Sequence, residues 1–355
     1  METAHTEIIV VIPCYNEPDM MRTVESLFDC ERGNFGVEII LVVNSYAISP
    51  EAVRETNRIS FREAKRFASA NNVPGFSLYP VLIEDLPGRQ TGAGLPRKAG
   101  MDEAARKFRK NNLPQGIIVS LDADTTVEKN YLAEIYRCFK KDKLRSATIE
   151  FHHSVEHLDP EDAVRKAAEA YEKYLRDYRS ALEYTGFPYP HYTIGSAFAV
   201  TEETYRKAGG MGKQQAGEDF YFLQKVFPLG KTRFIDTTCV YPAARISSRV
   251  PFGTGPAIAQ MIEENCFVKP VYREGAFEGL KQLFDRIPSF YQSSAGQIDA
   301  SIKDLPEHLR DFLAANGFLA KMEEINRHTA TPENFRKRFF SYFSAFRIVK
   351  YLHAN

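Results

Sequence analysis

The chain has 355 residues, of which 44% are hydrophobic and 26% charged, so we expect a globular protein with room for a large α/β domain and an appendage. Its 46 Lys and Arg residues balance 46 Asp and Glu residues, and without a basic excess we expect no nucleic-acid partner. The absence of a CxxC pair, a signal peptide and an apolar run of membrane-spanning length favours a cytoplasmic protein with reduced cysteines.

Strand-like and helical stretches alternate in the first half of the chain. Apolar runs predict strands at residues 8–12, 37–43, 76–83 and 117–121, and helical spacing predicts helices at 19–28, 50–70, 97–108 and 127–139. This alternation predicts an α/β fold with a mostly parallel sheet. Loops that follow parallel strands meet at one edge of such a sheet, where ligands bind. We therefore expect four loop residues to share one cleft: Pro13, Asn44, Asp85 and Asp122.

The second half begins with a long charged helix predicted at residues 160–184, an aromatic, Pro-rich segment at 184–192 and a strand at 193–200. Beyond residue 255 helical patterns dominate. We predict an α/β domain over residues 1–250 and a helical C-terminal extension over residues 251–355. Aromatic side chains recur at helical spacing over residues 335–352, beside Arg and Lys residues. This helix either packs on the protein or contacts the inner face of a membrane peripherally.

The string Ser-Leu-Asp-Ala-Asp-Thr at residues 120–125 follows the fourth predicted strand. Asp122 and Asp124 can both turn toward one cation there, because the chain is leaving the regular pleat. Mg²⁺ and Mn²⁺ prefer carboxylate and phosphate oxygens, and often use one or two protein carboxylates together with substrate phosphates. A divalent-metal site is one interpretation; a turn in which Asp124 or Thr125 caps the next helix is the other.

Two further strings stand at strand and helix ends. Val-Ile-Pro-Cys-Tyr-Asn-Glu occupies residues 11–17 after the first strand, and taken alone it is a loop with a helix cap. Gly-Glu-Asp-Phe occupies residues 217–220 at the start of a helix, where acidic side chains also complement the helix dipole. In order and spacing, these strings and the Asp-Ala-Asp turn together resemble glycosyltransferase family 2, from about residue 8 to about residue 230.

The resemblance implies a GT-A fold, which is a Rossmann-like sheet that binds a nucleotide-diphosphate sugar, in the α/β domain. In the family, the loop after the first strand holds the base and ribose of the donor. Carried over to this sequence, the resemblance assigns the nucleoside to Pro13, Tyr15 and Glu17.

The same resemblance implies the chemistry of the reaction. Asp122 faces the ribose and, together with Asp124, contributes to binding the Mn²⁺ or Mg²⁺ ion that bridges the diphosphate. Asp219 takes the family's position of catalytic base, with Glu218 beside it. The implied activity is transfer of a sugar to an acceptor hydroxyl with inversion of anomeric configuration.

The family's Gly-rich, basic segment is matched more loosely, by residues 88–100. Glycines permit close backbone approach and a helix N-terminus favours anionic groups, so Arg97 or Lys98 can reach the diphosphate. A flexible loop without a role in binding is the alternative.

The sequence departs from the family at two places. Asn44 stands where the family usually has an Asp that contacts the base, although Asp85 can supply an acid from the neighbouring strand. The base, uridine or guanosine, therefore stays open. No His occurs between residues 192 and 327 to serve as a third metal ligand. Arg245 and Arg249 lie in that region instead, and either grip the diphosphate or are ordinary surface arginines.

From these residues we expect a metal-dependent, hexosyltransferase-like glycosyltransferase with a UDP- or GDP-linked donor. The acceptor can be a glycan, a lipid-linked molecule or a small metabolite. Two alternatives stay open: a catalytically silent protein that binds a nucleotide sugar, and a nucleotidyltransferase. The second would normally carry a Gly-rich loop with a Lys after the first strand, where this chain has Pro-Cys-Tyr-Asn-Glu.

Overall fold

A computed structural model of the chain describes residues 5–87, 92–212, 217–246, 253–267 and 272–354. The chain divides into two compact units. Unit 1 comprises residues 1–172 and 191–267, and unit 2 comprises residues 173–190 and 268–355. Helix α5 (Ala163–Tyr184) begins in unit 1 and ends in unit 2. The division that the sequence suggested at residue 250 stays a prediction.

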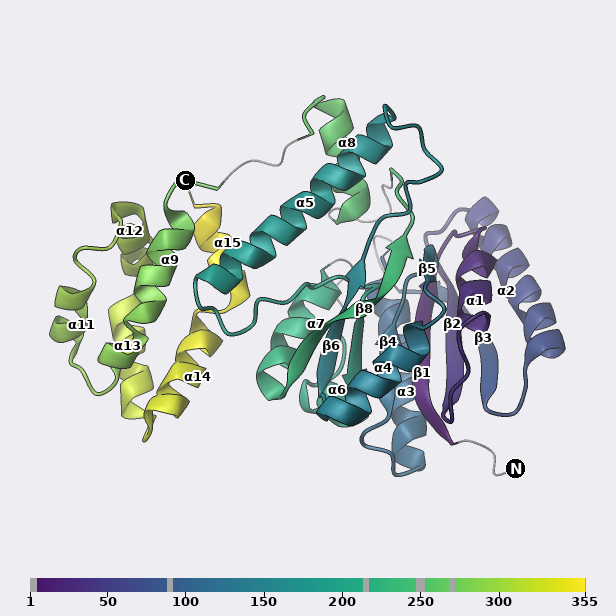
Figure 1. Cartoon of the computed structure of the whole chain (residues 1–355), viewed down its shortest axis with the longest axis horizontal. Coiled ribbons are helices and arrows are strands. Elements are labelled where there is room, and N and C mark those ends of the chain that lie inside the picture. Colours follow the sequence, from purple (N-terminus) through teal and green to yellow (C-terminus); the bar gives the residue numbers. More distant parts are fainter. Residues whose placement is uncertain (1–4, 88–91, 213–216, 247–252, 268–271, 355) are drawn as a thin grey trace. The chain divides into compact units, whose positions relative to one another are not determined.

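Unit 1 is built on a sheet of eight strands in the order β3-β2-β1-β4-β7-β6-β8-β5 (Figure 1). The strands are β1 (Thr6–Cys14), β2 (Gly36–Tyr46), β3 (Phe76–Leu86), β4 (Ile117–Ser120), β5 (Thr125–Val127), β6 (Ser146–Phe151), β7 (Phe198–Thr201) and β8 (Thr232–Pro242). The strands from β3 to β4 run parallel, as do β6 and β8, whereas β7 is antiparallel to β4 and β6, and β5 is antiparallel to β8. The expected α/β fold is confirmed.

Helices of unit 1 pack on this sheet. They are α1 (Met20–Phe28), α2 (Glu51–Asn71), α3 (Gly94–Lys110), α4 (Tyr131–Asp142), α6 (Glu202–Lys207) and α7 (Glu218–Val226), with the short 3₁₀ helix η1 (Phe227–Leu229). Helix α8 (Thr254–Glu263) packs instead against α5, with Ile258 and Met261 buried beside Ala167 and Ala168. Helix α3 contacts β1 and β2 at close range, because a Cβ atom added to Gly100 would lie 2.4 Å from Cγ1 of Val11. This packing fixes the first turn of α3 near the carboxyl ends of the central strands.

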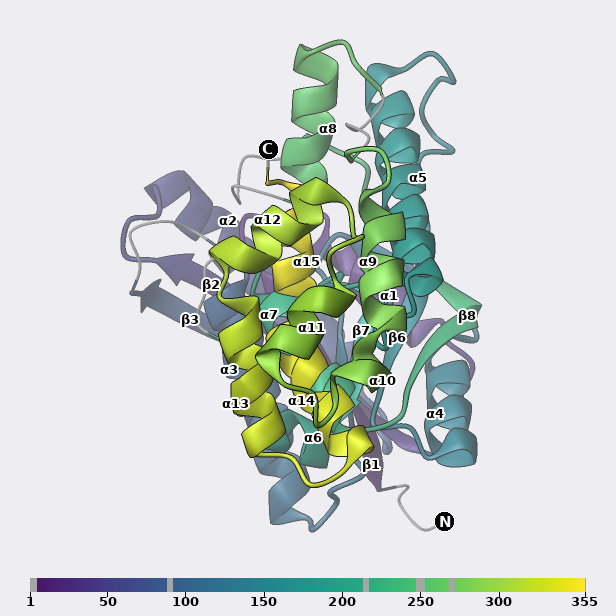
Figure 2. The same cartoon turned by 90° about the vertical axis from the view of Figure 1, so that its left-hand side faces the viewer.

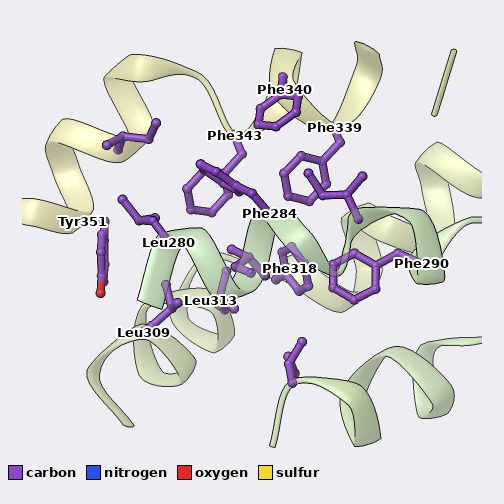
Figure 3. Close-up of a cluster of buried hydrophobic side chains, with 14 of the residues drawn as sticks. Leu280, Phe284, Phe290, Leu309, Leu313, Phe318, Phe339, Phe340, Phe343 and Tyr351 are labelled. Carbon is purple, nitrogen blue, oxygen red and sulfur yellow. The ribbon is translucent and has the colours of Figure 1, made fainter. Parts of the chain in front are cut away.

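Unit 2 is helical. Its helices are α9 (Ala276–Asp285), α10 (Ile287–Phe290), α11 (Ala295–Ser301), α12 (Glu307–Ala315), α13 (Phe318–Arg327), α14 (Pro332–Tyr342) and α15 (Ala345–Leu352), which lie together in Figure 2. Aromatic rings dominate the core: Phe284 contacts Phe339, Phe340 and Phe343 edge to face (Figure 3). Such pairs add about 0.5–1.5 kcal/mol each beyond the burial of area.

The C-terminal helical region expected from the sequence is therefore present. Phe335 and Phe339, from the aromatic stretch at residues 335–352, pack inside the core of unit 2. Contact of this stretch with a membrane surface stays a prediction. None of the described helices combines the length and the apolar composition that crossing a bilayer requires.

Local differences from the sequence-based expectations lie around the antiparallel strands. The helix expected at residues 127–139 begins only at Tyr131, because Thr125–Val127 is β5 and pairs with β8. The strand expected at residues 193–200 is confined to Phe198–Thr201. Strands β6 and β8 were not predicted. Since β5 follows the Asp-Ala-Asp turn directly, neither Asp124 nor Thr125 caps a helix, and that interpretation of the turn is wrong.

Candidate active site

Four segments bring polar side chains to the carboxyl end of β4. The turn after β4 carries Asp122 and Asp124, and it is closed by a bond from the Thr125 amide to the Asp122 carbonyl at 3.2 Å. Arg97 lies in the first turn of α3, and residues 191–197 lead into β7. Glu218 and Asp219 open α7 after Gly217, whose φ of 69° is a conformation that glycine adopts without strain.

The guanidinium of Arg97 joins these segments and is only 2% exposed. Its Nη2 donates to Oδ1 of Asp122 at 2.8 Å, and its Nε donates to Oε1 of Glu218 at 3.1 Å. Its Nη1 donates to Oγ of Ser120 at 2.7 Å and to the carbonyl of Gly195 at 3.0 Å. In this arrangement Arg97 holds the carboxylates in place, and four of its donor bonds go to protein atoms.

The carboxyl of Asp219 lies near the same guanidinium, on the side of Gly195. A Cβ atom added to Gly195 would lie 2.8 Å from Nη2 of Arg97 and 3.2 Å from Oδ2 of Asp219. The carboxyls of Asp122 and Asp219 therefore lie within a few ångströms of one guanidinium. The structure thus brings together the two acidic strings that the sequence placed about a hundred residues apart. We call the group around Arg97 the Arg97 cluster; it comprises Arg97, Ser120, Asp122, Gly195, Glu218 and Asp219.

The Arg97 cluster has three carboxyl groups and one guanidinium. Burial alone would lower the pKa of Arg97, but the charges of Asp122, Glu218 and Asp219 outweigh it and raise that pKa. Burial and the neighbouring Glu218 charge raise the pKa of Asp219 to about 7, although Arg97 opposes the shift. An acid whose pKa lies near neutrality can accept and release a proton under physiological conditions, which is what a general base requires.

A second guanidinium, that of Arg245, connects the loop after β1 with the Asp-Ala-Asp turn. Its Nη2 donates to Oδ2 of Asp124 at 2.6 Å, and its Nη1 donates to Oε1 of Glu17 at 3.1 Å. Nη2 also bonds to the second oxygen of Glu17, which is only 1% exposed. Burial would lower the pKa of Arg245, but the bond to Glu17 and the charge of Asp124 raise it. Arg249 lies outside the described residues.

Residues assigned to the nucleoside lie at the carboxyl ends of β1 and β2. Pro13 is buried in β1 opposite Val42. The Tyr15 hydroxyl lies 3.2 Å from Oγ of Ser49. Asn44 is fully buried at the end of β2, and neither polar atom of its amide has a hydrogen-bond partner among the described residues. A buried amide without partners is costly, and this one is a reason to look for a ligand group here.

Two further residues that the sequence predicted, Lys98 and Asp85, form ion pairs outside the Arg97 cluster. Nζ of Lys98 pairs with Asp102 one turn further along α3, at 2.6 Å. Asp85 has a 68% exposed side chain and pairs with Arg54 at 2.8 Å. Arg54 also donates to the carbonyl of Tyr46, which places Asp85 at the ends of β2 and β3, outside the Arg97 cluster.

The donor atoms at the Asp-Ala-Asp turn suit a hard divalent cation. One carboxylate oxygen of Asp122 bonds to Arg97, and one of Asp124 bonds to Arg245. Among the described residues, no group of three His, Cys, Asp or Glu side chains is placed to hold a metal ion. A cation here would therefore take part of its coordination from phosphate oxygens and water, as Mg²⁺ commonly does. The two aspartates fit that mode of binding.

Comparison with solved structures places S. aureus TarS among the similar proteins. The structure of TarS residues 1–349 in complex with UDP-GlcNAc matches with a TM-score of 0.47 and 12% identity, over 93% of this chain and 90% of TarS 1–349. The complex of the same residues with UDP matches with a TM-score of 0.44 and 11% identity, over 96% and 92%. Because the TM-scores are below 0.5, we base no assignment on them. No protein-family model and no curated protein matches the chain.

Sequence reasoning missed two members of the Arg97 cluster. Ser120 donates from Oγ to the Gly195 carbonyl at 2.7 Å and accepts from Arg97. In the sequence it stands only as the first residue of the string at 120–125, which assigns it no role. Gly195 falls within the strand that the sequence predicts at residues 193–200, and the structure begins that strand only at Phe198. Its signal in the sequence is a lone glycine before an apolar strand, which indicates close approach by other groups but does not identify them.

Proposed function

We propose that this protein is a glycosyltransferase of the GT-A type, which moves a sugar from a nucleotide-diphosphate donor to an acceptor hydroxyl. The observation that carries the proposal is the position of Asp219. Its carboxyl has a pKa raised to about 7 and shares the Arg97 cluster with Asp122 of the Asp-Ala-Asp turn. The proposed base and the turn that would bind phosphate thus lie close together at the carboxyl end of β4, the edge at which α/β folds bind nucleotides.

The nucleoside would lie along the ends of β1 and β2. Tyr15 offers a ring for stacking, and Asn44 offers a buried amide that can donate to and accept from a base edge. Both uracil and guanine carry an adjacent N–H donor and carbonyl acceptor that an amide can match, so UDP- and GDP-linked sugars both suit this residue. Pro13 would shape the floor of the same pocket as a buried residue of β1.

The diphosphate would lie at the Asp-Ala-Asp turn, beside Arg245. Arg245 supplies a fixed positive charge there, since it already bonds to Asp124. Mg²⁺ or Mn²⁺, when held by Asp124 and Asp122, would act as a Lewis acid on the departing diphosphate.

Asp219 would act as general base. Its carboxylate accepts the proton of the acceptor hydroxyl while the oxygen forms a bond to the anomeric carbon and the bond from that carbon to the diphosphate breaks. Attack from the face opposite the nucleotide inverts the anomeric configuration. Base assistance of this kind contributes about 10²–10⁴-fold to the rate. Glu218 would keep the pKa of Asp219 high enough for this step, and Arg97 would hold Glu218 in position.

Release of nucleotide from UDP-glucose, UDP-N-acetylglucosamine and GDP-mannose, measured with Mn²⁺ and without acceptor, tests the proposal. We expect slow hydrolysis of at least one donor, because water can replace the acceptor. Asp219→Asn should lower that rate by ~10²–10⁴-fold and leave the dissociation constant of the donor within about threefold. Asp236→Asn, which removes an exposed carboxylate, is the matched control. Donor binding without hydrolysis would favour a silent sugar-nucleotide-binding protein, and unchanged turnover by Asp219→Asn would remove Asp219 from the mechanism.

A further inference from the structure

A cavity of about 370 Å³ lies on the surface of unit 2, beside the end of α13. It is lined by His328, Asn334, Lys337, Arg338 and Ser341. Four of these residues belong to α14 and recur at helical spacing, so they form one face of that helix. The opposite face, with Phe335 and Phe339, lies in the core, which holds the polar face in a fixed orientation.

The lining is rich in hydrogen-bond donors and contains no carboxylate. An ammonium, a guanidinium, an amide, a hydroxyl and an imidazole can all donate to one anionic group. Glu324 pairs with Lys321 at 2.7 Å, and this bond, with a smaller contribution from the charge of His328, lowers the pKa of that acid. Two of the five side chains, Lys337 and Arg338, are cationic and can only donate, and the other three can donate as well as accept. This lining suits a ligand that presents several acceptor oxygens.

The cations at the cavity differ from their neighbours in lacking partners. Among the described residues, neither Lys337 nor Arg338 forms an ion pair, a side-chain hydrogen bond or a contact with an aromatic ring. Nearby, Arg336 lies over the ring of Phe340 at 4.9 Å and Arg347 over that of Tyr342 at 3.8 Å. The two free cations of α14 are therefore those that face the cavity.

The volume of the cavity indicates which ligands can fit. Sites for small molecules usually have volumes of about 300–1,000 Å³, and the cavity lies at the lower end of that range. All five lining residues are exposed, so the cavity is open to solvent and has room for a phosphate together with an attached body of about sugar size. Arg and Lys are the side chains that proteins most often use to bind phosphate oxygens.

We propose that this cavity binds the phosphate group of a phosphorylated molecule of about sugar size. Arg338 would bind two phosphate oxygens through its planar fork and Lys337 would add a second positive charge. Asn334 and Ser341 would contact the remaining polar groups. The proposal rests on unit 2 alone and holds whether or not the protein is a transferase.

Calorimetric titration of the full chain with glucose 6-phosphate, glucose and inorganic phosphate at low salt tests this site. We expect glucose 6-phosphate to bind, glucose not to bind, and the double variant Lys337→Gln/Arg338→Gln to bind at least tenfold more weakly. Arg336→Gln removes a charge from the same helix outside the cavity and should stay within twofold of the wild type. Because the substituted positions are exposed, we expect all of these variants to fold, and far-UV circular dichroism checks that they do.

The phosphate can also come from a lipid headgroup, which a second arm of the experiment distinguishes. Sedimentation with phosphatidylglycerol vesicles, compared with phosphatidylcholine vesicles, measures that source. Binding to anionic vesicles that the double variant loses, without binding of soluble sugar phosphate, would identify the headgroup as the source and support the site. Equal losses of affinity in Arg336→Gln and in the double variant would overturn the proposal. So would equal affinities of the wild type and the double variant for both the sugar phosphate and the vesicles.

Discussion

Replacing Asp219 with Asn separates the charge of this side chain from its shape. Asn keeps the acceptor oxygen to which the Phe220 amide donates at 2.7 Å, so the start of α7 should be preserved. What disappears is a carboxylate whose pKa is raised by burial and by Glu218. We expect this variant to lose activity and at the same time to be more stable than the wild type at alkaline pH.

The size of the gain follows from the pKa of Asp219. Because the folded protein raises that pKa from 3.8 to about 7, it holds a proton that the unfolded chain has already released. Ionisation of Asp219 therefore lowers the free energy of unfolding. The loss is absent below pH 3.8, grows as the pH rises to 7 and is constant above that. At about 1.36 kcal/mol per unit, the full cost is at most roughly 4 kcal/mol. Partial access of solvent to the side chain reduces it, so we expect a gain of about 2–4 kcal/mol.

Urea unfolding followed by far-UV circular dichroism measures this gain, since the chain contains no Trp for fluorescence. At pH 8.5 Asp219→Asn should show the full increase in the free energy of unfolding, and at pH 4.5 an increase below about 1 kcal/mol. Asp236→Asn, at an exposed position, should change neither. A gain of the same size at both pH values, or no gain at pH 8.5, would refute the assignment of a raised pKa to Asp219.

Two further substitutions test the two guanidiniums. Gly195→Ala places a methyl group 2.8 Å from the guanidinium of the Arg97 cluster, so we expect a loss of about 1–3 kcal/mol in unfolding free energy and a fall in nucleotide release of at least about tenfold. Gly296→Ala, which meets no atom within 4 Å, should show neither effect. Arg245→Gln removes a positive charge from the buried carboxylate of Glu17, and we expect urea unfolding to show a loss of about 1–3 kcal/mol. Arg245→Lys should recover part of it, and a loss below about 0.5 kcal/mol would mean that Arg245 adds little to stability.

The position of Asp122 at the ligand-binding edge could be expected from the sequence, because residues that follow parallel strands meet at one edge of the sheet. Asp219 opens helix α7, so its place beside Asp122 was expected only from the family resemblance. The sequence could not show how Arg97 is used. Its four acceptors lie 23 to 121 residues away along the chain, and no local pattern connects a guanidinium to groups at that separation. The sequence therefore indicates only that Arg97 or Lys98 can reach the diphosphate, whereas in the structure Arg97 donates four bonds to protein atoms.

Strands of the sheet were predicted well where they are parallel and fully apolar. Strands β1 and β2 are buried along almost their whole lengths, which produces the continuous apolar runs typical of central parallel strands. Strand β7 has only four residues and lies antiparallel between β4 and β6, and β5 has only three. Such short strands contain too few residues to show a period, so their existence depends on partners distant in the sequence.

Unit 2 is assembled from two stretches of chain that are separated by residues 191–267. Leu182 and Phe187, from the earlier stretch, are buried in the same core as Phe340, from the later one. During translation, residues 173–190 are therefore synthesised well before residues 268–355, with which they form the core. One cut before residue 268 therefore does not separate the helical unit intact, because the fragment that starts there lacks Leu182 and Phe187 from its own core.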